Sequence, residues 1–178
     1  MIKNNKKYFK TPSQTVGPFF TNYLNFNLSK KIYTEFNEKI DGQIMLKLNL
    51  KDKKKQLVKD AFIEYWQVLQ NNNNLLHFNR VNYSAKKRSY LISLNEYKSD
   101  TIIYITIFAR GLLNHLNTII YLEDRNFYKK DPFYKKLPIE RRKFMLAKLK
   151  KFTSNIKYYE HDLYLSGINE SIFFNYDN

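Results

Sequence analysis

The clearest hydrophobic pattern in this chain is the alternation over residues 43–50 (QIMLKLNL). Every even-numbered position there is Ile or Leu, and the positions between them are Met or polar. A period of two places successive side chains on opposite faces, so the pattern predicts a strand with one buried face. The charged run that follows, residues 51–55, predicts a turn.

Other segments have the β-branched and aromatic content of strands with less regular alternation. They are residues 57–69, 89–94, 102–109, 117–122, 158–165 and 171–176. A helix is the alternative for residues 57–69. Residues 102–109 (IIYITIFA) are almost continuously apolar, as expected for a strand that is buried on both faces.

One helix is predicted, over residues 138–151. Pro138 stands at its start, where the missing N–H is tolerated. Four apolar residues can share one side of this helix: Ile139, Met145, Leu146 and Leu149. The cations gather toward its C-terminal end, which suits the helix dipole.

Many short strands with one helix predict an all-β fold, either a sandwich or a barrel. The length of 178 residues fits a single domain spanning residues 1–178, with its β-rich core in residues 43–176. Residues 1–10 are polar and basic and predict a loose N-terminal arm. Residues 11–20 (TPSQTVGPFF) contain two prolines and a glycine and predict an extended segment.

The chain is strongly basic, with 31 Lys and Arg against 16 Asp and Glu, a formal charge of +15. Such a charge indicates an anionic partner, or else the Lys-, Asn- and Ile-rich composition of an AT-rich genome. The absence of cysteine excludes disulfides, thiolate metal sites and a cysteine nucleophile. We find no membrane-length apolar run and no signal peptide, and expect a cytoplasmic protein.

Few residues suggest chemistry by their spacing alone. His77, His115 and His161 are far apart and form no HxH, HxxxH or HExxH pattern, so no zinc or iron site is expected in this chain. Basic runs interleaved with Tyr and Phe are a candidate nucleic-acid footprint: residues 51–55, 129–136 and 141–151. No signature of a known nucleic-acid-binding module accompanies them.

Five segments resemble a known family when they are taken together and in order. They are TPSQTVGPFF (11–20), DAFIEYWQ (60–67), FARGLLNHLNTIIYLED (108–124), LPIERRKFMLAKL (137–149) and SIFFN (171–175). Their order and spacing resemble the alpha chains of protocatechuate 3,4-dioxygenases, which are the non-iron-binding halves of intradiol ring-cleaving dioxygenases. The resemblance covers roughly residues 9–176. It implies a single-domain, mixed-strand β-sandwich with one short helix and an extended N-terminal arm.

The resemblance also implies where the metal is held. In the family, the beta chain holds a non-haem Fe(III) with two tyrosines and two histidines, the latter spaced as HxH. The corresponding positions here are Ile102 and Tyr104, so this chain is not expected to bind iron or to be active alone. Fe(III) is expected in a partner beta subunit, with which this chain would form an obligate hetero-oligomer.

The same resemblance assigns a wall of the partner's substrate pocket to this chain. The residues implied are Thr15, Gly17, Pro18 and Phe19 of the N-terminal segment, together with Arg110. Gly17 permits close backbone approach and Pro18 fixes φ, as a rigid rim requires. Arg110 suits a substrate carboxylate, but an ion pair with an acidic residue of this chain or across the interface is an equal alternative.

Other family positions have structural interpretations. Trp66 is expected to fill the core, Gln67 to bond the backbone, and His115 to pack inside. Relatives commonly carry glycine at the turn that is Lys53–Lys55 here, and at the position of Asn79. The region 70–100 is also short against relatives.

The function implied is conversion of protocatechuate and O₂ to 3-carboxy-cis,cis-muconate, together with an iron-holding beta subunit. The substrate would be a catechol-type aromatic acid. The alternatives are a basic β-fold module that binds single-stranded nucleic acid and an intradiol-like scaffold without catalysis. The sequence leaves open which catechol is used and how many alpha–beta pairs assemble.

Overall fold

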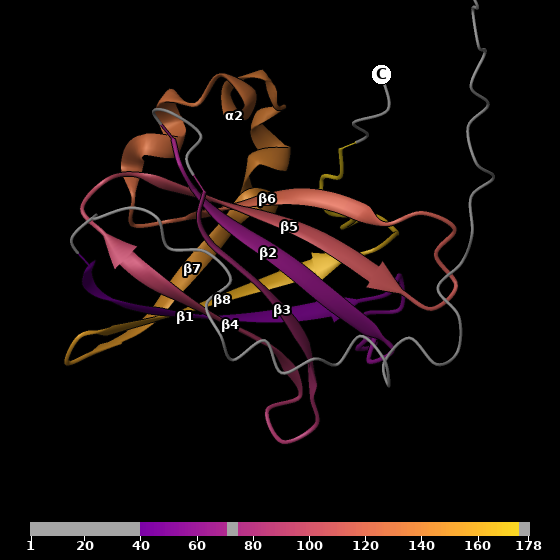
Figure 1. Ribbon diagram of the computed structural model, residues 1–178. Coiled ribbons are helices and arrows are strands. Elements are labelled where there is room, and N and C mark those ends of the chain that lie inside the picture. The colour runs from indigo at the N-terminus through magenta and orange to yellow at the C-terminus, as the bar shows by residue number, and fades with distance from the viewer. Residues whose placement is uncertain (1–39, 71–74, 175–178) are drawn as a thin grey trace, which may run out of the picture.

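The computed structural model describes residues 40–70 and 75–174, and these residues form an almost entirely β fold (Figure 1). The eight strands are β1 (Ile40–Lys51), β2 (Ala61–Leu69), β3 (Leu75–Ser84), β4 (Ser89–Tyr97), β5 (Thr101–Ala109), β6 (Leu116–Leu122), β7 (Leu146–Thr153) and β8 (Ile156–Tyr164). Three short helical turns lie between β6 and β7: η1 (Asn126–Lys130), α2 (Pro132–Lys136) and η2 (Ile139–Met145). The all-β prediction is confirmed for the described residues.

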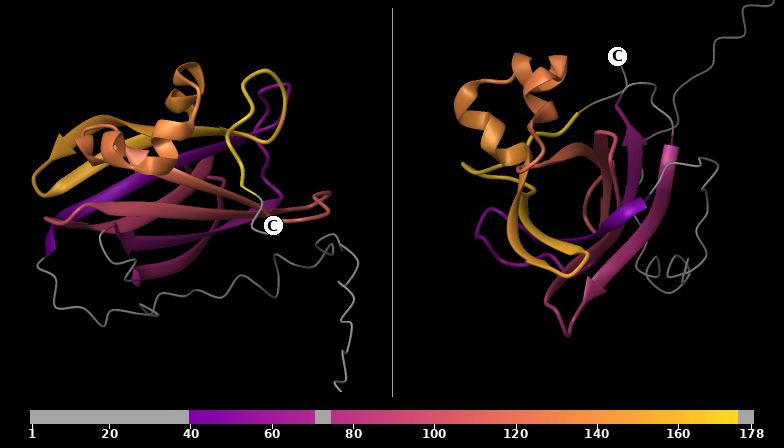
Figure 2. Two further views of the ribbon diagram at one scale, coloured as in Figure 1. Left: turned by 90° about the horizontal axis from the view of Figure 1, so that it is seen from above. Right: turned by 90° about the vertical axis from the view of Figure 1, so that its left-hand side faces the viewer.

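The strands are hydrogen-bonded in a closed ring in the order β1-β4-β3-β2-β5-β6-β7-β8 (Figure 2). Most pairs are antiparallel, whereas β1 with β8 and β6 with β7 are parallel, so the sheet is mixed as predicted. The ring is closed between β3 and β4 by only two residue pairs, Tyr83 with Tyr90 and Ser84 with Ser89. The hydrogen bonding therefore describes a closed barrel, one of the two architectures that the strand pattern predicted, whereas the family resemblance implied a sandwich.

The inward side chains of the barrel form its main core. Leu46, Leu48 and Leu50 on β1 are fully buried and pack with Ile103, Ile105 and other apolar residues from across the ring. The alternation over residues 43–50 is thus confirmed, because this one face of β1 is excluded from water. Burial of each such side chain is worth roughly 1.5–3 kcal/mol.

Polar groups inside the barrel are bonded to the backbone of a nearby strand. The Tyr65 hydroxyl on β2 donates to the Ser93 carbonyl on β4 at 3.1 Å, and burial raises the pKa of Tyr65 to about 12. Gln67 Nε2 donates to the Asn95 carbonyl, also on β4, at 2.8 Å. Because β2 and β4 both flank β3 in the ring, these bonds join the two strands on either side of β3, which itself pairs with β4 at only two residue pairs. The backbone-bonding role predicted for Gln67 is confirmed.

A second cluster packs outside the barrel, between the outer face of β5 and β6 and the helical turns, which Figure 1 shows above these strands. It buries Tyr121 on β6 together with aromatic residues from η1 and α2, and Met145 at the end of η2. Asp131 begins α2 as its N-cap, and its Oδ1 accepts from the Phe133 N–H at 2.8 Å. These contacts fix the helical turns against the barrel.

The predicted helix over residues 138–151 is wrong beyond its first turns. Only Ile139–Met145 is helical, as a 3-10 turn, and the chain then continues as β7. Residues Leu146 and Ala147 pair with β6, and Lys148–Thr153 pair with β8. Backbone hydrogen bonds to two neighbours outweigh the helical pattern of this segment.

Three other segments also differ from prediction. Strand β3 was not predicted, because its sequence (LLHFNRVNYS) is too polar to show a regular pattern. The predicted strand 57–69 begins at Ala61, although Leu57 makes an isolated bridge with Lys51. Of the predicted strand 171–176, the described residues show one bridge, between Phe174 and Asn117.

The turn after β1 takes the backbone geometry that glycine favours. Lys55 has a φ of 63°, and the preceding Asp52 accepts hydrogen bonds at Oδ1 from the N–H groups of Lys54 and Gln56. Asn79, the second position where relatives carry glycine, lies within β3 and has no such conformation. Only the first of the two glycine replacements therefore strains the backbone.

Candidate functional site

A hollow of about 460 Å³ opens on the outer face of the wall formed by β2, β5 and β6. Trp66 and Tyr104 lie opposite each other on β2 and β5, and both line it. Thr106 and Asn117 line its polar side, where the Thr106 hydroxyl donates to Asn117 Oδ1 at 2.7 Å. Apolar and aromatic groups therefore surround a small hydrogen-bonded pair.

The two positions implied as former histidine ligands share this outer face of β5. Ile102 is 5% exposed and packs in the aromatic cluster with Tyr121 and Tyr134. Tyr104 is half-buried and packs against the same cluster. An isoleucine offers no donor atom, and one phenol with a hydroxyl and an amide is a poor donor set for Fe(III). The residues at this site do not fit an iron ion.

The histidines are dispersed in the described structure. His77 on β3 faces Tyr65 inside the barrel, with ring centroids 5.6 Å apart, and His161 on β8 is also buried. His115 lies in the loop before β6 and is exposed, with its ring tilted over Phe108, so the prediction that it packs inside is wrong. In residues 40–70 and 75–174, no three His, Asp or Glu side chains gather where they could hold a metal ion.

Arg110 lies just after β5 and is about half exposed, at 52%. Its Nη1 is 3.4 Å from Asp60 Oδ2, and its backbone N–H donates to the Asp60 carbonyl at 3.0 Å. Within the described residues, Arg110 therefore forms an ion pair with an acidic residue of this chain, which was the alternative to a role at a substrate carboxylate. The pair is open to solvent, so the guanidinium keeps donors that can reach another molecule.

Two of the family positions on β2, Glu64 and Trp66, lie on its outer face. Glu64 forms a hydrogen-bonded ion pair with Arg80 on β3, a partner that the sequence did not suggest. Trp66 is half-buried against Phe78, with ring centroids 4.9 Å apart, and does not fill the barrel core. The prediction for Trp66 was wrong because Ile63, Tyr65 and Gln67 point inward, which turns the residues between them outward.

Thr15, Gly17, Pro18 and Phe19 lie outside the described residues. Their predicted place in a partner's pocket therefore stays a prediction, as does the N-terminal arm. The hollow instead adds Thr106 and Asn117, which sequence reasoning missed. Thr106 shares the alternate spacing of Ile102 and Tyr104, and that spacing is the signal that could have revealed it.

Solved structures show what this fold is similar to. The dioxygenase domain of a dioxygenase–carbohydrate-binding protein fusion from the cellulolytic bacterium Streptomyces sp. SirexAA-E matches with a TM-score of 0.54 at 12% identity, covering 88% of this chain and 98% of that one. The 3-chlorocatechol 1,2-dioxygenase of Rhodococcus opacus 1CP matches with a TM-score of 0.51 at 11% identity, covering 89% and 69%. The chlorocatechol 1,2-dioxygenase of Pseudomonas putida matches with a TM-score of 0.52 at 8% identity, covering 72% and 62%.

The chain therefore has the fold of intradiol ring-cleaving dioxygenases. No family profile and no curated protein sequence matches it. At identities this low, the likeness defines the fold, and function has to be argued from the residues of the site. In the described residues, no helix is long and apolar enough to span a membrane.

Proposed function

We propose that this chain is a non-iron-binding, alpha-type subunit of an intradiol ring-cleaving dioxygenase. Protocatechuate is the first candidate substrate and 3-carboxy-cis,cis-muconate the corresponding product. The observation that carries the proposal is the outer face of β5, where Ile102 and Tyr104 stand in a dioxygenase fold without a donor set for Fe(III). The iron, and with it the oxygen chemistry, would belong to a partner beta chain.

The contribution of this chain would be to position the substrate and exclude water from the partner's pocket. Thr15, Gly17, Pro18 and Phe19 are the residues proposed to form the pocket rim. Arg110 is proposed to meet the substrate carboxylate, and its half-exposed position with a loose 3.4 Å contact to Asp60 supports that role. A fully buried, tightly paired arginine could not serve a second molecule.

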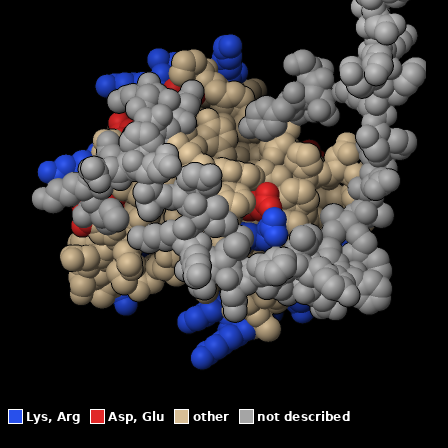
Figure 3. Space-filling model, in the orientation of Figure 1, with Lys and Arg blue, Asp and Glu red and all other residues tan. Residues whose placement is uncertain are grey.

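The described part of the face shown in Figure 3 lacks the continuous basic and aromatic surface expected of a nucleic-acid-binding module. On the face shown in Figure 3, most of the described surface is uncharged, and most Lys and Arg side chains lie toward its edge. Trp66 and Phe78 pack against each other on the outer side of β2 and β3. A strand-binding surface needs cations beside exposed aromatic rings over one continuous face.

Co-expression with an iron-holding intradiol chain tests the proposal. We expect a complex that co-purifies and shows the visible tyrosinate-to-iron charge-transfer band, perturbed by protocatechuate. The partner expressed alone, and this chain expressed alone with iron, are the controls. A full absorption band and full activity from the partner alone, with no complex formed, would reject the subunit role and leave the scaffold alternative.

A further inference from the structure

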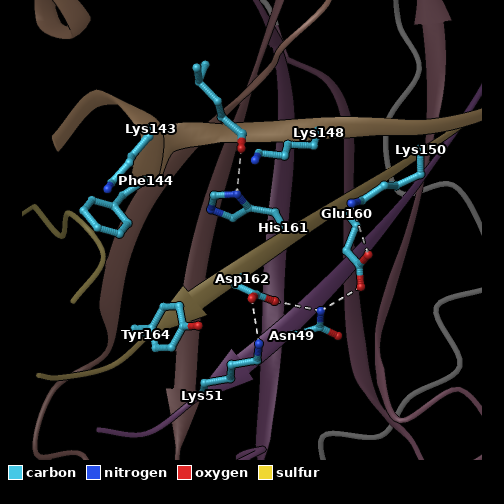
Figure 4. Close-up of a pocket in the computed structure, with 11 residues that line it drawn as sticks. Asn49, Lys51, Lys143, Phe144, Lys148, Lys150, Glu160, His161, Asp162 and Tyr164 are labelled. Atoms are coloured by element: carbon cyan, nitrogen blue, oxygen red, sulfur yellow. Dashed lines mark hydrogen bonds and ion pairs between the residues drawn. The ribbon is translucent and has the colours of Figure 1, made fainter. Parts of the chain in front are cut away.

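A second hollow, of about 420 Å³, lies over β7, β8 and the end of η2, and shares no residue with the hollow beside Tyr104 (Figure 4). Four lysines line it, from β1, η2 and β7, together with two acidic residues of β8. They are Lys51, Lys143, Lys148, Lys150, Glu160 and Asp162. Lys51, from the basic run 51–55, is thus brought beside three lysines of the run 141–151, far away in sequence.

The two carboxylates in this hollow are already neutralised. Glu160 Oε1 accepts from Lys47 Nζ at 2.8 Å, and Asp162 Oδ2 accepts from Lys51 Nζ at 2.6 Å. The Asn49 amide lies between them and donates to both, at 3.0 and 2.8 Å. Hydrogen bonds from Lys47 and Asn49 lower the pKa of Glu160, so the Glu160 carboxylate stays ionised and paired.

The remaining lysines give the hollow its excess charge. Lys143, Lys148 and Lys150 are exposed at its rim, and the nearest carboxylate contact of Lys150 is 4.0 Å from Glu160. Because Lys47 and Lys51 pair with the two acids, the three rim lysines leave the hollow with a formal excess of three positive charges. Such an excess complements a dianion.

His161 adds a buried acceptor to the same hollow. It is 5% exposed, and its Nδ1 lies 3.0 Å from the Leu146 carbonyl, which requires the proton on Nδ1 (Figure 4). Nε2 is then an acceptor without a hydrogen-bond partner, and because it has almost no exposed surface, a ligand reaches it only when the side chains that line the hollow move aside. A buried polar atom without a partner requires an explanation, and a ligand that donates a hydrogen bond supplies one.

Two aromatic rings also line the hollow. Lys143 Nζ lies 5.2 Å from the centroid of Phe144, and Lys51 Nζ lies 5.4 Å from that of Tyr164. These rings offer apolar contact beside the cations, which a bare inorganic anion would not use. The volume is within the range of small-ligand pockets, about 300–1,000 Å³.

We propose that this hollow binds a small phosphate monoester with a planar ring, of the size of a mononucleotide. The rim lysines Lys143, Lys148 and Lys150 would hold the phosphate dianion, because ammonium groups bind phosphate as point charges. His161 Nε2 would accept from a hydroxyl or N–H group of the ligand once the lining side chains have moved aside to expose it. A phosphate monoester carries close to two negative charges at neutral pH, whereas a monocarboxylate carries one.

Calorimetric titration of the full chain tests this proposal with adenosine monophosphate, inorganic phosphate, benzoate and a short oligothymidylate. Adenosine monophosphate should bind saturably and on the order of tenfold more tightly than benzoate, with phosphate between them. The double variant Lys143→Gln/Lys148→Gln should weaken adenosine monophosphate binding about tenfold. The matched control Lys86→Gln/Lys87→Gln, in the exposed turn between β3 and β4, should change it less than about twofold.

A second readout follows His161 directly, without a substitution in the barrel. In protein labelled at its histidines, the His161 ring signals should shift with saturation by adenosine monophosphate, while those of His77 should not. Absence of saturable binding, an equal loss in the control variant, or unmoved His161 signals would overturn the site. Tighter binding of oligothymidylate, lost equally in both variants, would also overturn it in favour of a general nucleic-acid surface.

Discussion

Arg110 and Asp60 are joined twice at the open end of β2 and β5. The Arg110 N–H donates to the Asp60 carbonyl at 3.0 Å, and the side chains approach to 3.4 Å, with each more than half exposed. The backbone hydrogen bond fixes the position of the Arg110 main chain. The solvent-exposed ion pair, in contrast, holds the guanidinium group only weakly. The arginine is therefore placed by the fold and available to a second molecule.

Replacing Arg110 in the proposed complex should distinguish its two interpretations. Arg110→Ala should raise the KM for protocatechuate at least about tenfold and leave the KM for plain catechol within about twofold, because only protocatechuate has the carboxylate. Steady-state kinetics with both substrates measure this. Lys86→Ala, in an exposed turn, is the control. Equal effects on both substrates would remove Arg110 from the carboxylate role.

Ile102 should matter for stability, since it is 5% exposed within the aromatic cluster. Ile102→Ala should lower the free energy of unfolding by about 2–4 kcal/mol through lost burial and a cavity. Ile139→Ala, at a residue that is 79% exposed, should change it by less than about 0.5 kcal/mol. Urea unfolding of the two variants gives the comparison, and similar losses would contradict the burial of Ile102 in the cluster.

His161 should make the protein less stable in weak acid. Burial is the main cause that lowers the pKa of His161 from the ordinary 6.5 to about 4. The hydrogen bond to the Leu146 carbonyl acts in the opposite direction and raises this pKa by a smaller amount. The unfolded chain therefore takes up a proton that the folded chain resists, and stability falls as the pH drops from 6.5 toward 4. The free energy of unfolding falls by about 3 kcal/mol in total, and this loss is complete once the pH is below the pKa of His161 in the folded chain.

Two measurements check this pH dependence. Urea unfolding between pH 7 and pH 4 should show a steeper loss of unfolding free energy for the natural chain than for His161→Gln. The two chains have the same carboxylates, so the contribution of the carboxylates cancels in the comparison. Titration of the His161 ring signals by NMR gives the pKa itself and does not depend on the variant. A ring that titrates near 6.5 would contradict the prediction.

Gly42 is needed where β1 passes close to the β7–β8 turn. A Cβ there would lie 2.8 Å from the Asn155 carbonyl oxygen and 3.2 Å from Glu96 Oε2. Gly42→Ala should therefore destabilise the fold by about 1–3 kcal/mol, because the backbone atom cannot move aside cheaply. Asp41→Ala, at the exposed neighbour, is the matched control in thermal unfolding. Equal stability of the two variants would contradict this close approach.

The sequence predicted the parts of the candidate site that follow from local spacing. Ile102 and Tyr104 are two residues apart, so they share a face of any strand, and the structure places both on the outer face of β5. The sequence left the partner of Arg110 open, because Asp60 is fifty positions away in the chain. It also could not bring Lys51 to Lys148, since that requires β1 and β7 on either side of β8.

By itself, the sequence determined the all-β class and the inward face of β1, because a period of two is a local property of the backbone. The tertiary structure alone decided that residues 146–153 are a strand, that LLHFNRVNYS is β3, and that the strands close into a ring. In each case the deciding free energy comes from hydrogen bonds and burial against segments distant in the chain. Those pairings have no periodic signature in any one segment.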